Sequence, residues 1–311
     1  MRGPRWLNSL NLLNLLNLLR SCPVDVDHVV YETPSVRVGA FRCPANHHSF
    51  RDSGPIREHC FVFPRTPVVI QHKDSQPFAA DPTLVALYNR GQEYSRERVS
   101  PDGDRCDWYS VSDALLRDAL AERDPRAADD GRRPIRFSFA RTTAGTYLLQ
   151  RQLFTRLLRE ERPDELYVEE TVIELLDRVF GAAYADPRRA LHESGSRRPA
   201  AETLAHDVCA LLGRRFTEPL TLADIAKALG TSPFHLCRSF KRATGVTLHD
   251  YRNQLRLRSA LDPLERADTD LSQLALAFGY SSHSHFTASF RRLFHLTPSA
   301  ARQAIGESAT S

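Results

Sequence analysis

Residues 222–252 read LADIAKALGTSPFHLCRSFKRATGVTLHDYR, and residues 271–302 read LSQLALAFGYSSHSHFTASFRRLFHLTPSAAR. Each segment starts with a short apolar helical pattern, passes through a glycine and a turn of small residues, and ends in a second helical pattern that carries basic residues. Gly230 and Gly279 stand where the chain must turn sharply, and glycine adopts positive φ there without a steric penalty. This order is typical of a helix-turn-helix, whose second helix enters the major groove of DNA.

The two segments are copies of one pattern. Their offset is about 49 residues, and the second copy has one extra residue in its turn. Two copies are too few for a solenoid, so the repeat predicts two DNA-reading units in one chain. The aligned pairs are Leu222 with Leu271, Ala226 with Ala275, Gly230 with Gly279, Leu236 with Phe286, Phe240 with Phe290, Thr247 with Thr297 and Arg252 with Arg302.

Residues 202–304 resemble the DNA-binding domain of the AraC/XylS family of bacterial transcription regulators. The resemblance covers about a third of the chain. It implies an all-α domain over 202–305, built from two helix-turn-helix units and a linker helix, in a sequence-specific DNA-binding regulator. The residues that carry it are Leu222, Ile225, Ala226, Gly230, Ser232, Leu236, Phe240 and Lys241, then Leu274, Ala275, Gly279, Tyr280, Ser282, Phe286, Phe290, Arg291, Thr297 and Pro298.

Helical spacing divides the second helix of each unit into two faces. Leu236 and Phe240, like Phe286 and Phe290, are four residues apart and are expected to face inward. The resemblance implies that early outward positions contact base edges. The expected base-reading residues are Phe234, Cys237, Arg238, Ser284 and Thr287.

Arg238 is the expected main reader, because a guanidinium can donate two hydrogen bonds to guanine. Members of the family often carry Arg where this chain has Ala288, which favours mainly positional contacts from the second unit. For each single residue the alternative is a solvated helix face. The expected phosphate contacts are Lys241, Arg242, His283, Arg291 and Arg292.

Residues 247–264 are expected to form one helix between the units. About 16 residues at ~1.5 Å each give a spacer of roughly 24 Å, which suits major grooves that recur about every 34 Å along one face of DNA. Asp270 is the expected N-cap of the second unit. His235 and His285 occupy matched positions in different units, which favours structural or phosphate-proximal roles over a metal pair.

The chain has 311 residues, enough for about two ordinary domains, and its formal net charge of +4 permits nucleic-acid binding without requiring it. Its six cysteines form no CxxC pair and no secretory signal is evident, so reduced thiols in the cytoplasm are expected. Residues 1–23 contain an Asn-Leu-Leu repeat that is too short and too polar to span a bilayer. We expect a disordered or artefactual leader there, and the alternative is an amphipathic surface helix.

Residues 24–184 are expected to form a separate domain. Short β-branched and aromatic runs between turn residues favour a small barrel or sandwich in its first part. Helical spacing over 141–184, with Asp164 as an N-cap, predicts a helical hairpin that packs on the strands, pairs with a second subunit, or does both. Residues 185–201 are rich in charge and small residues and are the expected linker.

The same region more loosely resembles the cupin-like sensor and dimerisation domain of some members of the family, so an α+β chain is expected. That resemblance implies a small-molecule effector, a homodimer and contact with RNA polymerase, more often for activation. The alternative is a metal-dependent cupin-type enzyme or metal sensor fused to a DNA-binding domain. The usual cupin ligand spacing and the common hydrolase motifs are missing, so no enzymatic activity, metal or other cofactor is expected. The residues of metal-ligating type are His47, His48, His59, His72, Cys43, Cys60 and Cys106.

Overall fold

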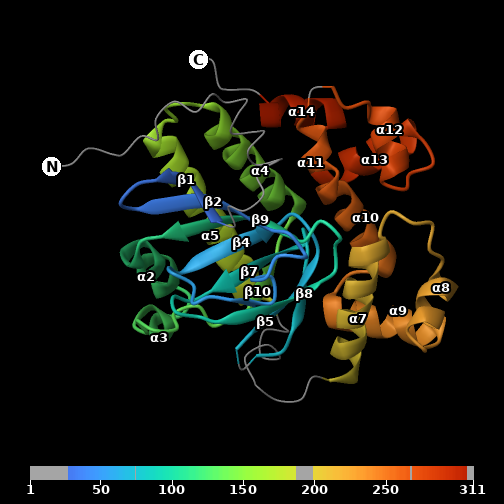
Figure 1. Cartoon of the computed structure of the whole chain (residues 1–311), viewed down its shortest axis with the longest axis horizontal. Helices are drawn as coiled ribbons and strands as arrows, with labels where there is room; N and C mark the ends of the chain where they lie inside the picture. The colour runs from blue at the N-terminus through green and yellow to red at the C-terminus, as the bar shows by residue number, and fades with distance from the viewer. Residues whose placement is uncertain (1–26, 74, 187–198, 267, 307–311) are drawn as a thin grey trace.

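The computed structural model describes residues 27–73, 75–186, 199–266 and 268–306. Strands fill the first part of the chain, and the C-terminal helices, coloured yellow to red, lie beside them (Figure 1). The architecture is therefore mixed, with an N-terminal sheet region and a helical C-terminal region, as the sequence predicts. The expected leader at 1–23 and most of the expected linker at 185–201 lie outside the described residues.

The larger sheet has six antiparallel strands in the order β1-β2-β9-β4-β7-β10. Its central strands β4 and β7 are buried at every position, because both of their faces are covered. This explains why they consist almost entirely of apolar residues. The bounds are β1 (Asp27–Glu32), β2 (Val36–Cys43), β4 (Cys60–Pro64), β7 (Leu84–Tyr88), β9 (Asp104–Val111) and β10 (Phe139–Arg141).

The smaller sheet has four antiparallel strands in the order β3-β8-β5-β6. Among the described residues neither sheet closes on itself, so the expected cupin-like barrel is not confirmed. Alternation of apolar and polar residues predicts which face of a strand is buried, but it does not predict whether the edges of a sheet pair. The bounds are β3 (Asp52–Ser53), β5 (Val68–His72), β6 (Phe78–Ala80) and β8 (Tyr94–Arg98).

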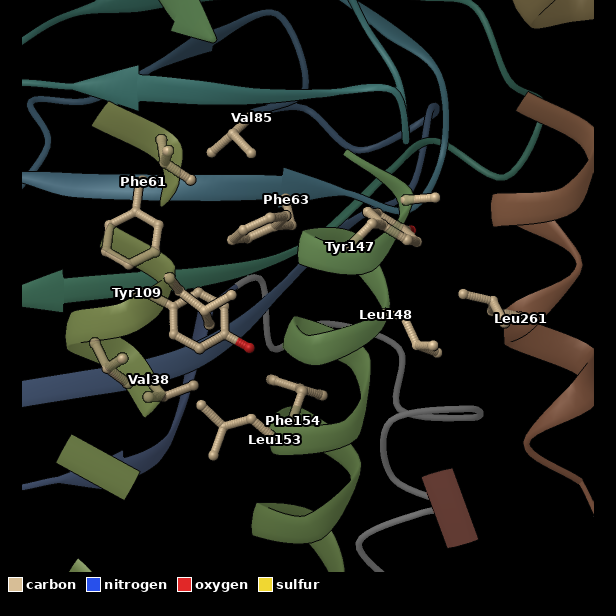
Figure 2. Close-up of a cluster of buried hydrophobic side chains, with 14 of the residues drawn as sticks. Val38, Phe61, Phe63, Val85, Tyr109, Tyr147, Leu148, Leu153, Phe154 and Leu261 are labelled. Carbon is tan, nitrogen blue, oxygen red and sulfur yellow. The ribbon is translucent and has the colours of Figure 1, made fainter. Parts of the chain in front are cut away.

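The predicted helical hairpin is present as α4 (Ala144–Arg159) and α5 (Glu165–Ala185). Asp164 caps α5, since its side chain accepts a hydrogen bond from the N–H of Tyr167 at 2.8 Å. Figure 2 shows Phe63 of the larger sheet beside Tyr147 of α4, and Tyr109 of the same sheet beside Leu153 and Phe154. The hairpin thus packs on the strands, and the short helices α2 (Asp113–Ala121) and α3 (Pro125–Ala128) complete this region.

In the described residues of the C-terminal region, the regular elements are all helices, and Asp270 caps α12 as expected. The expected linker helix is divided at Ala260. Pro263 has no N–H to donate to the carbonyl of Ser259, so the helical ladder is interrupted there. The bounds are α7 (Ala200–Arg215), α8 (Leu222–Ala228), α9 (Pro233–Thr244), α10 (Leu248–Ser259), α11 (Leu261–Leu264), α12 (Leu271–Ala277), α13 (His283–Phe294) and α14 (Pro298–Gly306).

The two regions share one hydrophobic core. Helices α10, α13 and α14 pack against α4, and α7 packs against β5 and β6. Leu261 of α11 is fully buried and lies near Leu148 of α4 (Figure 2). Side chains of the second helix-turn-helix, including Phe286 and Phe290, belong to the same cluster as the sheet residues. The first helix-turn-helix has a separate core of its own.

A buried ionic network joins the same two regions. Arg151 of α4 is 1% exposed and pairs with Asp107 of β9 and with Glu265, which follows α11. Arg65 pairs with Asp262 of α11, which extends the network. These five residues come from four segments that are more than 40 positions apart in the sequence, so the network fixes how the helical region sits on the sheet region.

Candidate DNA-binding surface

The first unit consists of α8 and α9, and local sequence signals set its geometry. Thr221 and Asp224 form a reciprocal capping box at the start of α8. Ile225 and Ala226 are buried where α8 crosses α9. Gly230, at φ +61°, turns the chain between the helices, as the sequence predicts.

Helix α9 has one buried and one exposed face. Leu236 and Phe240 are fully buried, which confirms their predicted inward orientation. Phe234 is 76% exposed near the start of the helix, and Cys237 and Arg238 are exposed one turn later. A single exposed aromatic ring is common on protein surfaces, so it is the combination of Phe234 with exposed Cys237 and Arg238 on one helix face that suits a contact surface.

The second unit repeats this arrangement in α12 and α13. Phe286 and Phe290 are fully buried, as predicted, and Tyr280 packs edge-on against Phe286 at 5.3 Å between ring centroids. Gly279 has φ +76° and lies against the carbonyl of Thr217 and the guanidinium of Arg256, so a side chain has no room there. This glycine is therefore required both for its φ and for close packing.

A shallow hollow of about 610 Å³ lies over the outward face of α13. Ser284 and Ala288 are exposed there, whereas Thr287 is half-buried and its hydroxyl lies 3.4 Å from Nε2 of His283. Thr287 is thus the least accessible of the expected base readers. The lining residues are His283, Ser284, Thr287, Ala288, Arg291, Arg292 and Thr297.

The expected phosphate contacts are exposed on both recognition helices. In the part of the chain that the structure describes, none of their basic side chains has an ion-pair partner, and the same holds for Arg238. Cationic groups that are free of partners within the protein can neutralise DNA phosphates without breaking internal bonds. These residues are Lys241, Arg242, Arg291 and Arg292, with His283 exposed beside the last two.

Two arginines of α10 have a positioning role that the sequence reasoning missed. Arg252 donates to the carbonyls of Phe216 and Leu220, the latter at 2.8 Å. Arg256 donates to the carbonyl of Phe216 at 2.6 Å and to that of Gly279 at 3.0 Å. These bonds join the entry to the first unit with the turn of the second. No sequence motif marks them, because backbone carbonyls can accept from any residue that reaches them.

The histidines at matched positions lie in separate units and bond locally. Nε2 of His235 is 3.3 Å from the Ser239 hydroxyl, and Nδ1 of His285 is 3.2 Å from that of Ser281. Across the described ranges, His, Cys, Asp and Glu side chains are nowhere gathered in a group of three that could hold a metal ion. Cys43, Cys60 and Cys106 share one buried apolar cluster but do not form such a group. No helix within these ranges is long and apolar enough to cross a membrane.

The paired units define a double helix-turn-helix protein. A family model described as a helix-turn-helix domain matches residues 225–304. The chain is 34% identical over 98 residues to the regulatory protein SoxS of Escherichia coli K12, which is 32% of this chain and 92% of SoxS. The chain belongs to the AraC family of regulators.

Two further relatives match a similar share of the chain. The transcriptional regulator GlxA of Rhizobium meliloti is 36% identical over 88 residues, which is 28% of this chain and 27% of GlxA, so the chain spans about a quarter of that relative. The solved structure of an AraC-type transcriptional regulator from Chromobacterium violaceum aligns at 30% identity over 35% of this chain and 97% of that chain, with a TM-score of 0.33. SoxS and GlxA are both named as regulators.

Proposed function

We propose that this protein is a sequence-specific transcription regulator that binds double-stranded DNA through α9 and α13. The observation that carries the proposal is the pair of recognition helices, each with an exposed face bearing basic side chains that have no ion-pair partner among the described residues. Helix N-termini and cationic side chains suit the phosphates, and the exposed polar side chains between them suit base edges.

The two helices have different roles in this proposal. Arg238 reads a guanine from α9, with apolar contacts from Phe234 and Cys237 to a thymine methyl group. On α13 the small Ala288 reaches no base, and the half-buried Thr287 reaches less far than an exposed residue would. The second unit therefore mainly fixes the position of the protein on the DNA, through phosphate contacts from His283, Arg291 and Arg292. Its contacts with bases are limited to Ser284 and Thr287.

A small-molecule effector is proposed for the sheet region. A cavity of about 340 Å³ is lined by residues of both sheets, a volume within the usual range for ligand pockets. Phe41, Tyr88 and Trp108 give it an aromatic wall, and Arg37 and Asp104 supply charge. This arrangement supports a cupin-like sensor role for residues 24–184, followed by a linker at 185–201 and a DNA-binding domain at 202–305.

Dimerisation through the sheet region is also proposed. Leu166 and Ile173 of α5 are 66% and 42% exposed and lie seven residues apart, hence on the same side of the helix. A second copy of α5 would cover them. In a cytoplasmic homodimer of this kind the DNA-bound protein would activate transcription through contact with RNA polymerase.

Selection of binding sites from a random pool of duplex DNA by the full-length protein tests the proposal. The expected product is an asymmetric motif of two short blocks about one helical turn apart, of which the block under α9 is the more strongly defined. Duplication of the whole motif would support the dimer. Absence of any enrichment, with and without cell extract as a source of effector, would contradict a regulator that reads sequence.

A further inference from the structure

The cavity between the two sheets carries polar groups that identify the kind of ligand it can hold. Its volume is about 340 Å³, at the lower end of the usual range for ligand pockets. Tyr88 and Trp108 line it from the larger sheet, and Ile70 and Tyr94 from the smaller one. This size suits a molecule of one or two rings. The polar atoms that the cavity presents then decide which groups such a molecule must carry.

Asp104 offers the cavity a hydrogen-bond acceptor. The residue is 5% exposed, and its Oδ2 accepts from Nη1 of Arg96 at 2.8 Å. Its Oδ1 has no hydrogen-bond partner among the described residues, yet this atom is not sealed from solvent, and Asp104 lines the cavity. A buried carboxylate oxygen without a partner is costly unless a donor can reach it. An O–H or N–H group of a ligand would supply that donor.

Tyr88 offers a second free group in the same cavity. It is 3% exposed, and within the described ranges its hydroxyl also lacks a partner while remaining accessible. Burial, with a contribution from the charge of Asp104, raises the pKa of Tyr88 well above its ordinary value. The hydroxyl therefore keeps its proton at neutral pH and can donate. A hydroxyl group of a ligand fits both sites, because it donates to a carboxylate and accepts from a phenol.

The guanidinium groups inside the cavity wall are already engaged. Arg96 is 1% exposed and donates to Asp104, to the carbonyl of Phe50 at 2.9 Å and to a serine hydroxyl. Arg37 forms ion pairs with Glu32 and Glu58. A ligand carboxylate would therefore stand against Asp104 without a free cation beside it. An ammonium group is also disfavoured, because Arg96 already neutralises that carboxylate.

Trp108 gives the cavity a flat wall in a fixed orientation. Its Nε1 donates to Oδ1 of Asp27 at 2.7 Å. Its ring lies directly over Gly39 of the adjacent strand β2, where a Cβ would come within 2.3 Å of ring atoms. The hydrogen bond and the close packing together hold the plane of the indole. A planar ring of a ligand can stack on such a surface or meet it edge-on.

Much of the remaining lining is apolar, and this disfavours a sugar. Val62, Val68 and Ile70 line the cavity, and all three are less than 9% exposed. A sugar carries hydroxyl groups around its whole ring, so some of them would face these side chains without a partner. A ring with a hydroxyl on one edge leaves the rest of its surface apolar and avoids this cost.

We propose that this cavity binds a neutral phenol of one or two rings, whose hydroxyl donates to Asp104 and accepts from Tyr88 while its ring lies against Trp108. If the cavity is the effector site proposed above, on which this inference rests, that phenol is the effector. Carboxylates, ammonium compounds and sugars of the same size are then poor ligands.

Three probes of nearly the same shape test the chemistry on the full-length protein without DNA. They are para-ethylphenol, para-ethylfluorobenzene and the anion para-ethylbenzoate, each titrated with protein in a calorimeter. The phenol is expected to bind about tenfold or more tightly than the other two, since only a hydroxyl both donates to a carboxylate and accepts from Tyr88. Equal binding of the phenol and the fluoro compound would overturn the proposal. So would tighter binding of the benzoate, or no binding of the phenol.

Tyr88→Phe is the diagnostic variant, because it removes one hydroxyl and keeps the ring. It is expected to weaken para-ethylphenol about fivefold and to leave para-ethylfluorobenzene unchanged. Tyr31→Phe is the matched control, since Tyr31 is also buried but lies outside the cavity, and it is expected to change neither affinity. An equal loss for both probes in Tyr88→Phe, or no loss for either, would refute the assigned hydrogen bond. If Tyr88→Phe does not fold, the probe comparison on the wild-type protein still decides.

DNA affinity, measured on the selected binding sequence with and without para-ethylphenol, separates this proposal from that of the regulator. The phenol is expected to change the DNA affinity of the wild-type protein and to have less effect on Tyr88→Phe. Phenol binding by a protein that binds no DNA would keep the phenol site and remove the regulator. DNA binding by a protein that does not bind the phenol would keep the regulator and remove the phenol site.

Discussion

At the scale of single residues, Arg238 and Lys241 stand three positions apart on α9 and are both exposed, yet they are expected to do different things. A residue near the start of a recognition helix reaches into the groove, whereas one nearer its end reaches the phosphates beside it. Exposure alone does not separate these two roles. They differ in whether replacing the residue changes DNA affinity for one base sequence or for all sequences alike.

Replacing Arg238 by Ala is expected to remove discrimination at one base pair, at a cost of about 1–3 kcal/mol on the best sequence. The reason is the loss of two directed hydrogen bonds to one base. Fluorescence anisotropy on a panel of single-base operator variants at fixed salt measures this. A uniform loss of affinity across the panel would make Arg238 a phosphate contact.

Replacing Lys241 by Ala is expected to weaken binding to all sequences alike and to reduce the salt slope of log affinity by about 1. A variant that makes one fewer phosphate contact releases one fewer counterion when it binds DNA. The loss of affinity is the same for every base sequence, because phosphates do not differ between sequences. Titrations over a range of salt concentrations give the slope. Arg117→Ala, on α2, serves as the control for net charge, and a slope change as large in that variant would speak against a specific contact.

At the scale of elements, the units follow their local sequence closely. The turn glycines, the cap at Asp270 and the inward Phe240 could be predicted because each depends on φ, on one hydrogen bond or on helical period alone. The break at Ala260, in the helix expected between the two units, also had a local signal in the sequence, namely Pro263. The exposed residues proposed as DNA contacts were predicted to face outward, but whether they bind bases or phosphates is a property of the complex.

The two turn glycines provide a matched pair. Gly230→Ala is expected to cost about 1–2 kcal/mol of unfolding free energy, because φ is positive but the space is open. Gly279→Ala is expected to cost about 1–3 kcal/mol more, since the new Cβ would overlap the carbonyl of Thr217 and displace Arg256. Urea unfolding of the full-length variants measures the difference. Equal costs would show that the close packing at Gly279 is unimportant.

At the scale of the whole molecule, the sequence indicates little about which distant segments contact one another. Arg151 and Glu265 are separated by 114 positions, and nothing in either segment indicates that they meet. Such pairs depend on how finished elements dock, and periodicity carries no information about docking. The same limit applies to the two open sheets, where a barrel was expected. Edge pairing is decided by twist and loop length and not by the pattern within a strand.

The buried network makes a strong prediction about stability. Arg151→Met is expected to cost about 3–5 kcal/mol, because Asp107 is 1% exposed and would lose its closest cation. Arg178→Ala, which breaks an exposed pair with Glu174 on α5, is expected to cost only about 0.3–0.5 kcal/mol. Thermal unfolding of both variants checks the contrast. Similar small losses in the two would mean that the network does not hold the regions together.

The bonds of Arg252 and Arg256 have a consequence for the operator. They fasten α10 to the entry of one unit and to the turn of the other, while the second unit also packs on α4 (Figure 1). If both units touch DNA, their reach is fixed by the protein and cannot follow a change in the duplex. Each base pair inserted between their contacts rotates the second one by roughly 34° about the duplex axis, since a turn holds about 10.5 base pairs. The affinity for the operator should therefore fall when even one base pair is inserted between the two contacts. Base changes within that spacer should have little effect on affinity.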